Sequence, residues 1–266
     1  MERVDSATFW YLPVWSLWRR EIVRFLRQRS RVIGALGTPI VFWVLIGSGL
    51  GNSFRYQFAA NGPAAEMNYL EYSFPGMMAL MVLFTAVFSM ISVIEDRREG
   101  FMQAVLAAPV ARSAIVVGKI LGSTTLAVGQ GLLFLALAPA AGISLGIGSI
   151  VAALLVLIVL GIGLSGLGFV IAWSMDSTQG FHAIMNLVLV PMWMLSGALF
   201  PPTGALRWMA WLMMINPLTY GVTALRQALY LRVDLAGGSA ESAVAISMAF
   251  AVAMVLLAAR IVAKKG

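Results

Sequence analysis

Long apolar segments separated by short polar ones dominate the sequence. Each segment is about the 20 residues that an α-helix needs to cross the hydrocarbon core of a bilayer. Open strands cannot cross it, because each unpaired backbone group in lipid costs several kcal/mol. The pattern predicts an all-α integral membrane protein with about six transmembrane helices, near residues 32–51, 75–94, 113–138, 150–173, 181–200 and 243–263.

Composition supports one membrane domain. Of the 266 residues, 61% are hydrophobic and 11% are charged, too few polar groups for a soluble domain surface. We expect residues 1–31 to form a cytoplasmic N-terminal amphipathic segment and residues 32–266 to form the six-helix transmembrane domain, with no room for a soluble catalytic domain. The chain has no cysteine, which excludes disulfides and thiolate metal sites.

Positive charges gather in alternate gaps between the apolar segments. Fourteen Lys and Arg residues lie before the first span, between the second and third, and after the last, whereas four lie on the opposite side: Arg55, Arg207, Arg226 and Arg232. The positive-inside rule therefore predicts that both termini lie in the cytoplasm. We expect the protein to reside in the cell (inner) membrane. Nucleic-acid binding would need a basic patch on a soluble face, and the net charge of +7 is instead explained by topology.

The N-terminal segment has the pattern of a helix lying on the membrane surface. Apolar residues recur at helical spacing, and arginines mark another face, which suits an anionic cytoplasmic leaflet. The apolar set is Trp15, Trp18, Ile22, Phe25 and Leu26, and the basic set includes Arg19, Arg20, Arg24, Arg27 and Arg31. An ordinary basic flank that only sets orientation is the alternative. We do not expect a cleavable signal peptide, because no small-residue cleavage site follows a short apolar run.

Ionisable side chains are nearly absent from the predicted spans. Lys119 and His182 lie within spans, both near a span end, which argues against a secondary transporter with its own proton relay. Gly118-Lys119 is followed by Ile120, so it is no phosphate-binding loop, and one histidine cannot make a metal cluster. We expect no catalytic, metal or cofactor site here, and any energy for transport comes from another chain.

A mixed-charge segment follows the second predicted span on the cytoplasmic side. It reads Glu95-Asp96-Arg97-Arg98-Glu99-Gly100-Phe101 and continues to residue 112. Its early acidic residues favour a helix N-terminus, while its charges and the apolar Phe101, Val105 and Leu106 offer a docking surface.

A second constellation is external, after the fifth predicted span. It contains Ser196, Gly197 and Pro201, then Asn216, Pro217, Tyr220 and Arg226. The segment 201–230 is too apolar for a solvated loop and too broken by proline for a span, so we predict short helices re-entering the outer leaflet. Capping and interfacial anchoring explain Asn216 and Arg226 without any substrate contact.

Together these motifs resemble the type-2 permease family of ATP-binding-cassette exporters. The matching features are Glu95 to Gly100, Pro109-Val110 with Arg112, Gly118-Lys119, Ser196-Gly197 with Phe200-Pro201, Asn216-Pro217-Leu218 with Tyr220, and Ala224-Leu225-Arg226. Six spans, cytoplasmic termini and a basic amphipathic N-terminus also fit. The pattern most resembles multidrug, antibiotic-resistance and lipo-oligosaccharide exporters.

The resemblance implies a membrane half-transporter. Such a chain pairs with a second permease copy as a homodimer and with two copies of a separate ATPase, and residues 95–112 would be the coupling segment. The substrate path would lie between the permeases. A secondary carrier or channel, a membrane enzyme and an assembly factor are the competing classes, and a neighbouring ATPase gene would discriminate among them.

Overall fold

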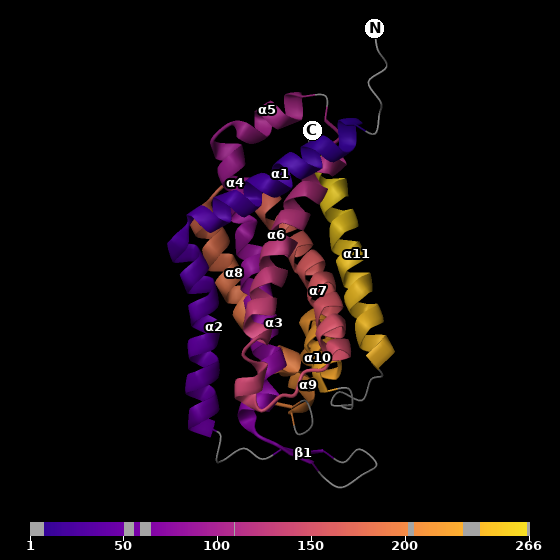
Figure 1. The fold of residues 1–266 in the computed structure, drawn as a ribbon. Helices are drawn as coiled ribbons and strands as arrows, with labels where there is room; N and C mark the ends of the chain where they lie inside the picture. The colour runs from indigo at the N-terminus through magenta and orange to yellow at the C-terminus, as the bar shows by residue number, and fades with distance from the viewer. Residues whose placement is uncertain are drawn as a thin grey trace.

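The computed structural model describes residues 8–50, 56–58, 65–108, 110–201, 205–230 and 240–264. Within these ranges the chain is almost entirely helical (Figure 1). The long helices are α1 (Thr8–Arg27), α2 (Arg29–Leu50), α3 (Tyr69–Ser89), α6 (Arg112–Leu135), α7 (Ile147–Trp173), α8 (Thr178–Trp193) and α11 (Ala240–Lys264). The shorter ones are α4 (Ile91–Arg98), α5 (Phe101–Ala107), η1 (Ala138–Ala141), η2 (Met194–Ala198), α9 (Arg207–Ile215) and α10 (Pro217–Tyr230).

The predicted all-α membrane fold is confirmed. Six helical segments of the described chain are long and apolar enough to cross a membrane: Val32–Gly49, Tyr69–Arg98, Arg112–Leu135, Ile147–Trp173, Thr178–Ala198 and Glu241–Lys264. The exception is a hairpin of two three-residue strands, β1 (Tyr56–Phe58) and β2 (Ala65–Met67), in the connection between α2 and α3. Hydropathy did not indicate it, because strands this short carry no periodic signal. Arg3, Arg55, Pro109, Pro202, Arg232 and Lys265 lie outside the described residues.

Helix α3 is the most enclosed helix of the bundle. Nearly all of its side chains are buried, and it packs against α2, α6, α7 and α8. Helix α3 begins with a capping box. The Asn68 side chain accepts from the Glu71 backbone N–H, and the Glu71 carboxylate accepts from the Asn68 backbone N–H. In contrast, α2 and α11 lie at the periphery, and only 17% and 22% of the residues in their apolar segments are buried, as in helices facing lipid.

Helix α1 lies across α6 at two glycines of α6. A Cβ atom at Gly118 would lie 2.9 Å from Leu17 Cβ, and one at Gly122 would lie 2.7 Å from Glu21 Cβ. Because glycine has no side chain there, the two backbones can approach closely, as in GxxxG packing between membrane helices. Trp18 Nε1 also donates to Thr125 Oγ1 of α6 at 3.0 Å.

The short elements gather at the two ends of the bundle. In Figure 1, α1, α4, α5 and the end of α11 lie at one end, while β1, α9 and α10 lie at the other. The two motif regions of the sequence therefore lie at opposite ends, as their places in the sequence predict.

Replacing Gly118 by valine should displace α1 from α6. The added side chain meets Leu17 and Val14, and overpacking of this kind costs about 1–3 kcal/mol. We expect a lower midpoint of thermal unfolding for the detergent-solubilised protein. Gly129→Val on the same helix is the matched control, since nothing lies within 4 Å of a Cβ there. Equal midpoints for the two variants would contradict the close packing of α1 on α6.

Candidate functional site

A cluster of buried charges joins three helices at the end of the bundle that holds α4 and α5. Lys119 of α6 and Asp96 of α4 are both 0% exposed, and the Lys119 ammonium contacts the carboxylates of Asp96 and Glu21. It also donates to Ser92 Oγ at 3.1 Å. A buried ammonium needs such partners, because an isolated charge in a medium of low dielectric is costly. Glu21 belongs to α1, so the cluster fixes α1 against α4 and α6.

Two arginines of α1 complete the cluster. Arg20 donates two parallel hydrogen bonds to the Asp96 carboxylate, each 2.7 Å long, and Arg24 donates to Asp96 at 3.0 Å and to Glu95 at 2.6 Å. Bidentate pairs of this type are both strong and directional. The hydrogen bond to Asp96 raises the pKa of the Arg20 guanidinium above its ordinary value. The cluster as a whole is electrically balanced, since Glu21, Glu95 and Asp96 face Arg20, Arg24 and Lys119.

The turn after α4 directs α5 back over α1. Gly100 has φ +78°, a left-handed conformation that other residues rarely adopt, and it immediately precedes α5. The next residue, Phe101, lies under the Arg20 guanidinium, with the Arg20 Cζ 3.8 Å from the ring centroid. This cation–π contact joins α5 to the charge cluster.

The prediction that Glu95 and Asp96 begin a helix is wrong. They lie near the C-terminal end of α4, whose last turn also contains Arg97 and Arg98, and α5 begins without an acidic residue in its first turn. The reason is that helical structure resumes at Ile91, directly after α3, and extends to Arg98. The carboxylates are therefore held by arginines of another helix and not by backbone N–H groups.

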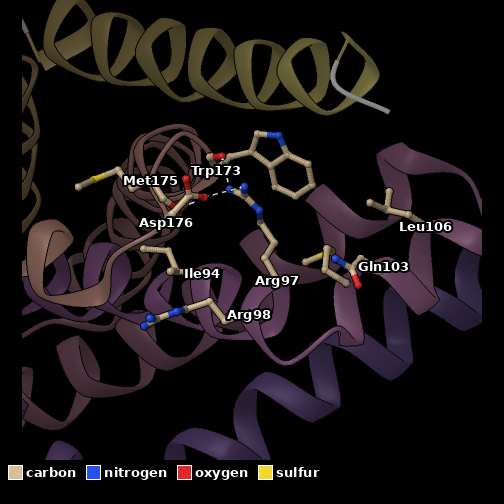
Figure 2. A pocket seen from close by; sticks show the side chains of 9 residues that line it. Ile94, Arg97, Arg98, Gln103, Leu106, Trp173, Met175 and Asp176 are labelled. Carbon is tan, nitrogen blue, oxygen red and sulfur yellow. Dashed lines mark hydrogen bonds and ion pairs between the residues drawn. The ribbon is translucent and has the colours of Figure 1, made fainter.

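Arg97 links α4 to the segment between α7 and α8. It donates to the Trp173 carbonyl at 2.6 Å and to Asp176 Oδ1 at 2.9 Å. Figure 2 shows its side chain pointing toward Trp173 and Asp176, whereas the Arg98 side chain points away from them. The Trp173 carbonyl belongs to the last residue of α7, so the guanidinium satisfies a free acceptor at a helix C-terminus.

The remaining charges of the segment face outward. Arg98 and Glu99 are exposed, and Arg98 forms no ion pair with any carboxylate in the described part of the chain. Of the predicted coupling residues, Asp96 is thus used internally, and Arg97 ties α4 to the segment between α7 and α8. Arg98 and Glu99 are exposed, with Glu99 lying 3.9 Å from Arg24.

The four arginines assigned to a membrane surface divide in the same way. Arg20 and Arg24 bind carboxylates of α4, while Arg19 and Arg27 are exposed and have no ion-pair partner among the described residues. Helix α1 also exposes large apolar side chains, those of Trp10, Tyr11, Leu12, Trp15 and Leu26.

At the other end of the bundle, the buried cation Arg226 organises the motif residues. Arg226 of α10 is 2% exposed, and its guanidinium donates to the carbonyl oxygens of Tyr72 at 3.3 Å and Gly197 at 3.1 Å and lies 4.4 Å from the Tyr72 ring centroid. No carboxylate within the described ranges pairs with it. The interfacial anchoring predicted for Arg226 is therefore wrong, because an anchoring arginine reaches toward water.

The break at the end of α8 supplies one of those carbonyls, that of Gly197, while Tyr72 belongs to α3. Leu195 and Gly197 have non-helical backbone angles, with Gly197 at φ +75°. The Gly197 carbonyl also accepts from the Tyr72 hydroxyl at 3.0 Å, and Ser196 Oγ donates to the Trp193 carbonyl at 2.6 Å. Backbone groups freed by the break are thus satisfied within the protein, as non-helical backbone at membrane depth requires.

Asn216 and Pro217 begin α10. The Asn216 side chain accepts from the Leu218 N–H at 3.0 Å, which confirms the predicted cap, and donates to the Met192 carbonyl of α8 at 2.6 Å. Tyr220 donates to Met214 of α9 at 2.8 Å, so its contact is local. Pro201 lies after η2 and makes none of these contacts.

A lateral cavity of about 570 Å³ opens between α2, α3 and α8. Its walls are largely apolar and include Phe42, Phe84, Phe88 and Trp193. Its few polar groups belong to Thr38, Thr85, Ser89 and His182, and the His182 ring stacks on Phe88 with centroids 5.0 Å apart. A largely apolar cavity with a few polar groups suits an amphipathic or aromatic molecule.

Comparison with known families decides the class of this membrane protein. Residues 13–230 match the family described as "ABC-2 type transporter". The matched range includes both motif regions. The chain belongs to the ABC-2 type transporter family. It is therefore a transport permease with membrane-spanning helices, as the sequence motifs indicated.

Two curated relatives of this ABC-2 permease show the breadth of the family. Nodulation protein J of Rhizobium leguminosarum bv. trifolii is 27% identical over 189 residues, covering 70% of this chain and 69% of the relative. The daunorubicin resistance ABC transporter permease protein DrrB1 of Streptomyces coeruleorubidus is 23% identical over 235 residues, covering 86% of this chain and 78% of the relative.

The sequence analysis noted Gly118 and Lys119 as motif residues without their structural role, and it missed Glu21 and Gly122. A signal for the cluster was present, because a lysine within a membrane helix requires an acidic partner. Choosing among the acidic residues needed the three-dimensional arrangement. The spacing of Gly118 and Gly122 was also readable as a close-packing motif.

Replacing Asp96 by asparagine should destabilise this permease strongly. The substitution removes the carboxylate shared by Arg20, Arg24 and Lys119, and breaking a buried ion pair from one side costs about 3–5 kcal/mol. We expect a large fall in the thermal midpoint and in the yield of folded protein. Glu99→Gln at the exposed edge should cost at most about 1 kcal/mol. If the two variants unfold together, the buried cluster does not hold α1, α4 and α6.

Proposed function

We propose that this chain is the membrane subunit of an ATP-dependent exporter whose energy comes from a separate ATPase subunit. Family membership establishes a transport permease. The observation that carries the finer proposal is the placement of α4 and α5. Buried ion pairs hold α4 to α1 and α6, and the contact of Arg20 with Phe101 joins α5 to the same cluster, while Arg98 and Glu99 remain exposed. A surface that is fixed from within and charged outside is suited to transmit the movement of a bound partner.

We further propose that residues 95–112 are the coupling segment and that this end of the bundle faces the cytoplasm of the cell (inner) membrane. The charge distribution of the sequence supports this orientation. Helix α1 then lies at the cytoplasmic surface of the membrane, with Arg19 and Arg27 free to meet anionic headgroups and the exposed aromatic side chains in the interface.

A second permease copy would complete the substrate path. The lateral cavity is bounded by α2 and α8, and α8 exposes a row of apolar side chains beside it: Ile184, Leu187, Val188 and Val190. We propose that a homodimer covers these helices and that the cavity admits the substrate between the copies. The relative named for daunorubicin resistance supports a lipid-soluble aromatic compound as the first substrate to test.

Charge reversal at Arg98 should weaken binding of the ATPase. Arg98→Glu places a negative charge on an exposed site of the proposed interface, and losing one charge contact there should lower recovery of the ATPase roughly tenfold. The measurement is co-purification of an ATP-binding-cassette ATPase co-expressed with the permease, together with substrate-stimulated ATP hydrolysis in proteoliposomes.

The matched control is Arg207→Glu, the same substitution at an exposed site on the other end of the bundle. It should leave ATPase recovery unchanged. Loss of the ATPase with the Arg207 variant and not with the Arg98 variant would reverse the proposed orientation. Transport by the purified chain in the absence of any ATPase would replace the exporter with a carrier or channel.

Filling the lateral cavity should block transport without affecting assembly. Gly34 lines the cavity and has nothing within 4 Å of a Cβ atom, so Gly34→Trp can place an indole there. We expect daunorubicin export to fall at least roughly tenfold, because the substrate loses its apolar contacts. Gly37→Trp on the same helix is the control, as Gly37 is equally unobstructed but does not line the cavity. Equal export by both variants would place the path elsewhere.

A further inference from the structure

A pocket of about 280 Å³ (Figure 2), which we call the socket, is formed in part by α4, the helix that carries Asp96 of the charge cluster. Three segments form it: α4, α5 and the connection between α7 and α8. Its lining residues are Ile94, Arg97, Arg98, Met102, Gln103, Leu106, Trp173, Met175 and Asp176. The volume is at the lower limit for small-molecule sites, which typically enclose about 300–1,000 Å³. It suits a side chain better than a free ligand.

The walls of the socket define the chemistry of an occupant. Met102, Leu106, Met175 and the Trp173 ring supply apolar surface, and methionine adapts its shape to an inserted side chain. The charged rim is net positive, because Asp176 offsets Arg97 while Arg98 has no described carboxylate partner. An apolar side chain next to a carboxylate matches both properties.

The socket is also continuous with the exposed part of the proposed coupling segment. Gln103 and Leu106 of α5 line it and are exposed, and Arg98 of α4 lines its edge, with its side chain directed away from Trp173 and Asp176. Asp176, with an 89% exposed side chain, is held to α4 by Arg97. A partner seated in the socket would therefore contact α4, α5 and the α7–α8 connection together. That connection leads into α8, which forms one wall of the lateral cavity.

We propose that the socket receives an apolar side chain of the ATPase subunit, flanked by an aspartate or glutamate that pairs with Arg98. In this arrangement Arg97 is a positioning residue: it keeps the α7–α8 connection against α4, so that one inserted side chain moves both. The inference rests on the proposed function and goes beyond it, because it adds the α7–α8 connection to the docking surface and specifies what the partner inserts.

A photo-crosslinking amino acid at Gln103 tests the socket directly. We expect benzoylphenylalanine at this position, in membranes containing the co-expressed ATPase, to crosslink to an ATPase peptide that holds an apolar residue beside a carboxylate. The same amino acid at Ala104, which is exposed on α5 but does not line the socket, should give roughly tenfold less of that product. Mass spectrometry of the crosslinked peptide identifies the occupant.

Binding provides the second measurement. Gln103→Trp fills the socket and should lower co-purification of the ATPase roughly tenfold, whereas Ala104→Trp should not. Both sites are exposed, so both variants should keep the thermal midpoint of the unmodified protein.

Several results would contradict the proposed role of the socket. Equal crosslinking or equal ATPase loss at both positions would show docking on α5 without insertion, and a crosslink to a second permease copy would assign the socket to the dimer. Full ATPase recovery with both tryptophan variants would show that the socket does not bind the ATPase, and it would leave the exporter proposal intact. If even the unmodified permease retains no ATPase, the exporter proposal itself fails, and the socket with it.

Discussion

The contact between buried Lys119 and the carboxylates of Asp96 and Glu21 determines how one end of this protein is built. An ammonium on a membrane helix is stable only if negative groups reach it, and here one comes from α4 and one from α1. Once Asp96 is held inside, Arg20 and Arg24 of α1 are drawn to it, and Phe101 at the start of α5 stacks on Arg20. The positions of α1, α4 and α5 are thus linked through one set of charges.

The opposite end of the bundle also buries a cation, but uncharged groups stabilise it there. Arg226 is buried without a described acidic partner, and carbonyl oxygens and an aromatic face receive it. The Gly197 carbonyl lies at the interruption of α8 at Leu195 and Gly197, and the Tyr72 carbonyl lies in the first turn of α3. The two ends therefore differ in kind: ion pairs between helices at one, and a cation bound by an interrupted helix at the other. The lateral cavity lies on the bundle between them, beside α8.

Hydropathy and charge distribution predicted the membrane class, the six long helices and the two motif regions, because burial in lipid imposes length and composition directly on the sequence. Contacts between distant residues were beyond such patterns. Helical periodicity placed Arg19, Arg20, Arg24 and Arg27 on exposed faces, yet two of them bind α4, since periodicity describes a face and not what covers it. Glu95 and Asp96 were assigned to a helix start for a related reason, as the continuation of helix beyond α3 leaves no mark in local composition.

The buried Arg226 has a consequence for the order in which the chain is assembled in the membrane. Both carbonyls that bind it, those of Tyr72 and Gly197, precede α10 in the sequence. During synthesis the acceptors emerge first, so α3 and the interrupted end of α8 can be in place when the arginine arrives. The cation then passes from water to its acceptors without residence in bare lipid, which would cost several kcal/mol. Because synthesis runs from the N-terminus, the carbonyl acceptors are made before the arginine that binds them.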